Sequence, residues 1–166
     1  MNQFLMTLPD LIILAVFYFL FLFSAWKKNQ NLRINTGIYI SVILVLYFTL
    51  MPVILRIPAF HTGRSSQYNI FPYTDWFHHY GSYRRQSFGN MALFIPFGYC
   101  MKAKKKNWFW RIIFIGMVLS FTVEFFQPLI SYTRVCDITD LSDNTIGTAL
   151  GVLLWILMHH LFKPDH

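Results

Sequence analysis

Long apolar blocks constrain this chain more than any other feature. The clearest runs from residue 11 to residue 23 without a charged side chain, inside a predicted segment over 5–26, and further blocks cover 34–55, 87–101, 108–130 and 142–162. A membrane-spanning helix needs about 20 mostly apolar residues. Charged residues make up only 13% of the chain, against about 25% in a soluble domain. This excludes a water-soluble globule and predicts a single-domain (1–166), all-α, polytopic integral membrane bundle with about five transmembrane segments.

The third block is the weakest of the predicted segments. It is short for a membrane crossing, contains Pro96 and carries Gly89 and Gly98 near its ends. Irregular backbone at membrane depth needs surrounding protein or water. We therefore predict a short third segment that is tilted, broken or partly re-entrant.

The basic residues orient the predicted helices. With the N-terminus outside, every lysine falls in an inner connection or at the inner end of the chain, as do Arg33 and Arg111. The outer connections hold the other arginines: Arg56, Arg64, Arg84, Arg85 and Arg134. Inner loops of membrane proteins are enriched in Lys and Arg. We predict a multi-pass cell-membrane protein with a cytoplasmic C-terminus. The net charge of +7 lies in separate clusters, so no nucleic-acid partner is expected.

A polar stripe interrupts the block over 108–130. Its members recur every three or four residues and therefore share one helix face: Gly116, Ser120, Glu124, Gln127 and Ser131. Glu124 lies roughly 9 Å inside the outer end of this helix, at 1.5 Å per residue. A carboxyl at that depth must face protein or water. It is either a structural hydrogen-bond anchor or a functional group, and it is the candidate catalytic residue.

A second polar face leads into the last block. Asp137, Asp140, Asn144, Gly147 and Gly151 recur every three or four residues. Acidic side chains favour a helix N-terminus, where they complement the helix dipole. The Gly147 and Gly151 pair has the spacing that allows another helix to approach closely. We predict that these two glycines are packing residues.

Several polar residues from three segments are expected to converge at the outer surface. The predicted binding residues there are Asn90, Glu124, Gln127, Arg134, Asp137, Asp140 and Asn144. Oxygen ligands of this kind can hold Mg²⁺ or Ca²⁺, but no metal motif is present, and a mutually satisfied cluster with Arg134 as counter-ion is favoured. We predict no metal and no cofactor. Arg84 and Arg85 either bind phosphate or carboxylate groups in the site or contact lipid headgroups.

Three motifs resemble one family. Residues 90–98 resemble the pattern N-x-x-x-F-x-P-x-G, residues 124–127 resemble E-x-x-Q, and residues 134–151 resemble R-x-x-D-x-x-D-x-x-x-N-x-x-G-x-x-x-G. These are marks of the VanZ-like membrane proteins, and the motif-bearing part covers 69–151. One departure is Tyr73, where the family's N-x-x-P-F motif usually ends in Phe. We expect this Tyr to pack as the Phe would.

The resemblance implies a role in the bacterial cell envelope, since the founding VanZ protein is associated with teicoplanin resistance in Gram-positive bacteria. The leading hypothesis is a non-catalytic protein that binds a lipoglycopeptide antibiotic or a lipid-linked cell-wall precursor in an outer-leaflet polar pocket, among membrane lipids. Two alternatives stay open. One is an intramembrane enzyme acting on a lipid-linked or glycopeptide substrate, and the other is a small carrier of lipids or polyprenyl phosphates.

Overall fold

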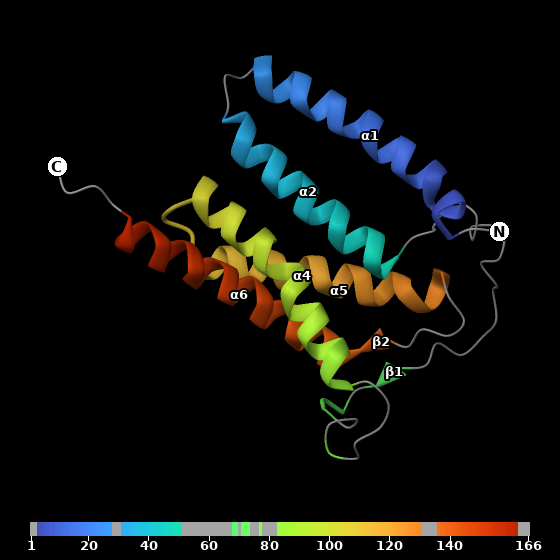
Figure 1. The fold of residues 1–166 in the computed structure, drawn as a ribbon. Helices are drawn as coiled ribbons and strands as arrows, with labels where there is room; N and C mark the ends of the chain where they lie inside the picture. Colours follow the sequence, from blue (N-terminus) through green and yellow to red (C-terminus); the bar gives the residue numbers. More distant parts are fainter. Residues whose placement is uncertain are drawn as a thin grey trace.

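The chain folds into a bundle of long helices. The computed structural model describes residues 3–27, 31–50, 68–69, 71–73, 77, 83–130 and 136–162. Within them run α1 (Gln3–Lys27), α2 (Leu32–Thr49), α4 (Tyr83–Lys104), α5 (Trp110–Ile130) and α6 (Ile138–Leu161), shown in Figure 1. The predicted all-α class is therefore confirmed. The one addition is a two-residue parallel ladder between β1 (Tyr68–Asn69) and β2 (Cys136–Asp137).

Four of the described helices are long and apolar enough to cross a membrane. The candidate spans are Thr7–Lys27, Leu32–Thr49, Trp110–Pro128 and Ile138–Leu161. The chain is thus a multi-pass membrane protein. Helix α4 does not belong to this set, as its weak apolar signal in the sequence suggests.

Helix α4 differs from the predicted short, broken segment. It runs 22 residues as one helix through Pro96, which is about 33 Å at 1.5 Å per residue. It lies parallel to α6 with matched steps of four, in the pairs Ser87–Asp143, Met91–Gly147 and Ile95–Gly151. Helix α4 therefore runs alongside the candidate span α6 from Ser87 to Ile95. Packing on α6 and α2 buries part of its surface, including Phe94 and Phe97.

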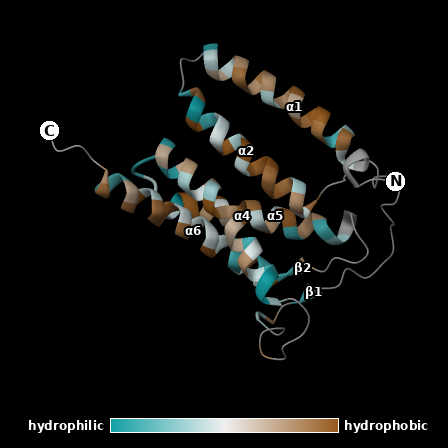
Figure 2. Cartoon of the chain, viewed as in Figure 1, coloured by the Kyte–Doolittle hydropathy of each residue, from teal (hydrophilic) through white to brown (hydrophobic). Residues whose placement is uncertain are grey.

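Helix α4 lies at the centre of the helix packing. Helix α4 packs on α6 and on α2, while α5 packs mainly on α6. The core at this centre contains Val45, Phe94 and Val123. Helix α1 lies outermost and packs on α2, where the Tyr18 and Tyr39 rings lie 4.8 Å apart. Figure 2 shows that α1 and the middle of α2 are hydrophobic, whereas hydrophilic residues gather where α4 begins beside β1 and β2.

Candidate functional site

The polar stripe of α5 faces protein. Gly116, Ser120, Glu124 and Gln127 are all buried, with Glu124 only 2% exposed. Ser131 lies outside the described residues. The side chains of Phe121 and Phe125, on the other face, are exposed. The burial of these residues confirms the predicted orientation of the stripe. A buried carboxyl in a membrane helix also needs polar partners.

Helix α6 supplies those partners through an antiparallel seam with α5. A Cβ atom at Gly116 would lie 2.3 Å from the Thr148 hydroxyl, and four residues further along α5 the Asn144 Nδ2 donates to Ser120 Oγ at 2.8 Å. Further along α5, Glu124 Oε2 accepts from the backbone N–H of Asp137, just before α6 begins. The Asn144 Oδ1 is buried without a hydrogen-bond partner in the described structure.

Asp137 joins three parts of the chain at the start of α6. As the N-cap residue, it accepts the Thr139 backbone N–H at 2.7 Å through its carboxylate, which satisfies a free amide of the first helical turn. Its own backbone N–H donates to Glu124 Oε2 at 3.2 Å. Asn69 Nδ2 donates to the other carboxylate oxygen at 3.1 Å. The cap thus ties α5, α6 and β1 together.

Asp143 lies at the centre of the cluster and is not among the residues predicted from the sequence. It has no exposed surface, and its carboxylate accepts hydrogen bonds from Tyr73 OH, at 3.2 Å, and from Ser87 Oγ. The spacing of Asp143, Gly147 and Gly151 by four residues was the available signal. It marks the face of α6 that meets α4, beside the Asn144 face that meets α5.

Tyr73 does more than the predicted packing role. Its hydroxyl donates a hydrogen bond to Asp143. A Phe at this position would have no hydroxyl to donate. Its backbone has φ 58°, a left-handed conformation that costs free energy for a residue with a Cβ atom. The Tyr73 N–H donates to Thr139 Oγ1 at 2.9 Å and helps to hold that conformation. The expected packing role of this ring stays a prediction, and the hydrogen bond of its hydroxyl adds a contact that a Phe could not make.

Two groups outside the helical spans have raised pKa values, because they are partly buried beside the carboxylates. Burial raises the pKa of the Tyr73 phenol, and the charge of Asp143 and the hydrogen bond to it raise this pKa further. Burial likewise raises the pKa of the Cys136 thiol, with added contributions from the charges of Glu124, Asp137 and Asp140. Burial is the largest cause of both pKa shifts, and the neighbouring negative charges add to it because a further negative charge is unfavourable beside them.

Other predicted site residues take different positions. Asn90 is half-buried on α4, and no hydrogen bond joins it to the cluster in the described structure. Arg84 and Arg85 are exposed in the first turn of α4, where Arg84 Nε donates to Tyr83 OH at 3.1 Å. Arg134 lies outside the described residues. The functional roles of all these residues stay predictions.

One open cavity of the described structure lies away from this cluster. It is an apolar groove over α6 and α4, reaching from Leu150 to His160. Across the described ranges, no group of three or more His, Cys, Asp and Glu side chains is placed to hold a metal ion. The acidic cluster is instead engaged by hydroxyl, amide and backbone donors.

Comparison with known proteins gives one finding. A family model described as VanZ/LLP1 matches residues 11–159, which extends well beyond the motif-bearing part over 69–151 and includes α2 and most of α1. No curated protein and no solved structure matches the chain.

Proposed function

Because the chain belongs to the VanZ/LLP1 family, we propose that it acts in the bacterial cell envelope and lowers susceptibility to teicoplanin-type lipoglycopeptides. In this proposal it binds the drug or a lipid-linked cell-wall precursor, without catalysis. The binding residues are those of the α5–α6 seam and the start of α6. Arg134, Arg84, Arg85 and Asn90 complete the site at the outer surface.

The buried amide of Asn144 carries this proposal. Its Nδ2 binds Ser120, but its Oδ1 has no partner in the described structure. Buried polar atoms are nearly always hydrogen-bonded, and one that is not costs about 1–3 kcal/mol. A ligand hydroxyl or amide N–H that reaches this seam would recover that free energy. Glycopeptides and cell-wall precursors carry many such donors.

The hydrogen bonding of the carboxylates favours a binder over an acid–base enzyme. Glu124 Oε2 accepts from the Asp137 backbone, and Asp137 caps α6. Asp143 is engaged by Tyr73 and Ser87. A general base needs a lone pair within reach of the substrate proton, and each of these carboxylates already accepts a hydrogen bond that joins elements of the fold. We therefore place the enzyme and carrier hypotheses behind the binder.

The proposal is tested by antibiotic susceptibility in a Gram-positive host with and without this chain. We expect the chain to raise the inhibitory concentration of teicoplanin and to leave that of vancomycin, which lacks the acyl tail, unchanged. Glu124→Ala and Arg134→Ala should each abolish the effect. The double variant should be no worse than either single one, because residues acting as a unit are non-additive.

The matched control is Lys27→Ala, an exposed residue at the far end of α1. Expression in the membrane is measured for every variant. If expression-matched Glu124→Ala cells keep full resistance, the polar seam is scaffolding and the proposal is wrong. Consumption of a labelled envelope lipid by the purified protein would favour the enzyme, and lipid scrambling in liposomes would favour the carrier.

A further inference from the structure

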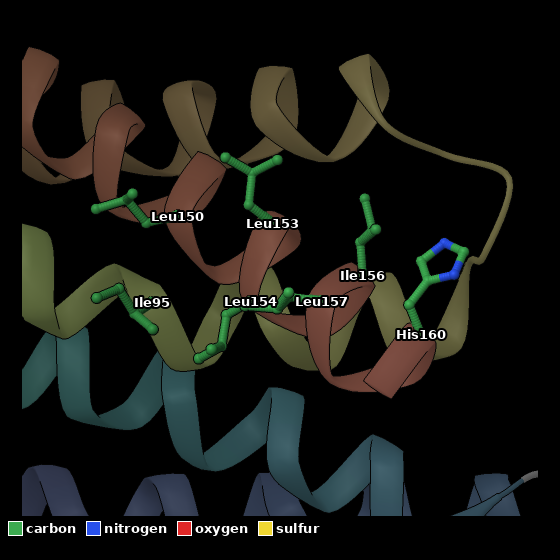
Figure 3. A pocket seen from close by; sticks show the side chains of 7 residues that line it. All are labelled: Ile95, Leu150, Leu153, Leu154, Ile156, Leu157 and His160. Atoms are coloured by element: carbon green, nitrogen blue, oxygen red, sulfur yellow. The ribbon is translucent and has the colours of Figure 1, made fainter. Parts of the chain in front are cut away.

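The apolar groove is a second feature of the molecule, separate from the polar seam. It has a volume of about 630 Å³ and is lined by Ile95 of α4 and by Leu150, Leu153, Leu154, Ile156, Leu157 and His160 of α6. Figure 3 shows the aliphatic side chains along the two helices and His160 at one end. Leu150, Leu153, Leu154 and Leu157 are exposed, so in a membrane protein the groove opens to lipid.

The length of the groove corresponds to one leaflet. From Leu150 to His160 the helix rises about 15 Å at 1.5 Å per residue. The hydrocarbon core of a bilayer is about 30 Å thick, so one acyl chain reaches about half of it. The groove therefore runs from the middle of α6 to the membrane surface and matches a single lipid tail in length.

Basic residues lie at the surface end of the groove. His160 lies beside the connection between α4 and α5 in Figure 3, and Figure 1 shows the C-terminal end of α6 beside the same connection. Lys105 and Lys106 are exposed on that connection. Lys105 Nζ and Arg111 Cζ lie 5.1 Å and 5.2 Å from the centre of the Trp108 ring, respectively. An indole with two cations near its ring is suited to the membrane interface, where Trp is enriched.

We propose that this groove binds an anionic phospholipid, with one acyl chain along α6 and the phosphate at Lys105, Lys106 and His160. Basic pockets at helix ends are suited to anionic headgroups. A second copy of the chain fits the groove less well, because a parallel partner would bring its own basic connection to the same end and repel the first.

The test is lipid-dependent thermal unfolding of the purified full chain in detergent. Phosphatidylglycerol should raise the unfolding midpoint by roughly 5 °C at concentrations well above its dissociation constant. Phosphatidylcholine, with the same acyl chains, should raise it much less, and inorganic phosphate alone should not raise it. Native mass spectrometry should show one retained phosphatidylglycerol.

Two variants separate the tail from the headgroup. Leu153→Trp fills the groove and should abolish the retained lipid, whereas Val118→Trp, at an exposed position on α5, should not. The double variant Lys105→Gln/Lys106→Gln should remove the preference for phosphatidylglycerol. Its control, Lys27→Gln/Arg33→Gln, removes two exposed cations elsewhere and should preserve it.

Three results would overturn the proposal. Equal stabilisation by the two lipids would show that the basic connection selects nothing. Stabilisation by inorganic phosphate alone would show an anion site without an acyl chain. Retention of phosphatidylglycerol by Leu153→Trp, with an unfolding midpoint equal to that of Val118→Trp, would place the lipid elsewhere on the surface.

Discussion

At the scale of single residues, the hydroxyl of Tyr73 connects a short segment outside the helices to the buried face of α6. It donates to Asp143, which also accepts from Ser87 on α4. Three separate parts of the chain thus meet at one carboxylate. A buried carboxylate is stable only when such donors surround it. The Tyr73 hydroxyl therefore couples the segment around β1 to the stability of the bundle.

Tyr73→Phe should therefore destabilise the protein by about 1–2 kcal/mol, because Asp143 loses one donor while its packing is retained. The measurement is reversible denaturant unfolding in detergent. Tyr47→Phe is the control, because Tyr47 on α2 contacts the Phe48 ring edge-on through its own ring. This variant should change the free energy of unfolding by no more than about 0.5 kcal/mol. Equal stability of Tyr73→Phe and wild type would show that the Asp143 bond contributes nothing.

Cys136 reports on the charge of the cluster. Because burial and the charges of Glu124, Asp137 and Asp140 raise its pKa, its alkylation by iodoacetamide should reach half-maximal rate at a higher pH than that of a cysteine peptide, since the thiolate is the nucleophile. Measured in a Cys100→Ala background, Glu124→Gln should shift the profile back toward lower pH.

The raised pKa of Cys136 also determines how the stability of the protein changes with pH. A thiol whose pKa is raised by folding contributes stability below its unfolded pKa, and this contribution is lost as the pH rises through the folded pKa. Wild type should thus lose part of its stability above about pH 8.5, the ordinary thiol value, and Cys136→Ser should lose less. A reactivity midpoint at or below that of the peptide would contradict the assigned environment.

At the scale of elements, α4 and α6 approach each other closely at two glycines of α6. A Cβ atom at Gly147 would lie 2.2 Å from the Met91 carbonyl oxygen, and one at Gly151 would lie 2.1 Å from that of Ile95. These contacts confirm the predicted packing role of both glycines. They also explain why α4 needs less hydropathy than its neighbours, because backbone of α6 covers one of its faces.

Gly147→Ala should destabilise the bundle by about 1–3 kcal/mol or more, since the methyl group meets backbone that cannot rotate away. Gly89→Ala is the matched control, because nothing lies within 4 Å of a Cβ atom there. Ala is favoured over Gly inside a helix, so this control should be neutral or slightly stabilising. Equal unfolding midpoints for the two variants would show that the helices separate at this point without cost.

At the scale of the whole molecule, the two ends of the bundle differ in chemistry. The carboxylates, β1 and β2 lie at the start of α6, whereas the lysines of the α4–α5 connection lie beside its end. The sequence predicts that the lysine end is cytoplasmic, because positive residues concentrate in inner loops. This orientation stays a prediction of the sequence.

Labelling of intact cells tests it. A membrane-impermeant amine reagent should leave Lys104, Lys105 and Lys106 unmodified, and lysis should expose them. Ser65→Cys, on the opposite predicted side and outside the described residues, should react with an impermeant thiol reagent before lysis. Modification of the lysines in sealed cells would reverse the orientation of the whole chain.

The sequence alone determined the membrane class, the all-α class, the buried stripe of α5 and the glycine face of α6. Each of these features follows from composition or from a repeat of three to four residues, so it can be predicted without knowing the tertiary contacts. The candidate cluster at the start of α6 was located for the same reason, through Glu124, Asp137 and Asn144.

Only the tertiary structure decided which faces meet. Asp143 and Asn144 are adjacent in sequence, yet one contacts α4 and the other α5. The length of α4, the cap contact of Asn69 and the hydroxyl contact of Tyr73 depend on partners far away in the chain. Periodicity places a residue on a face of its own helix, but the partner of that face follows from packing of the whole bundle, which no local pattern contains.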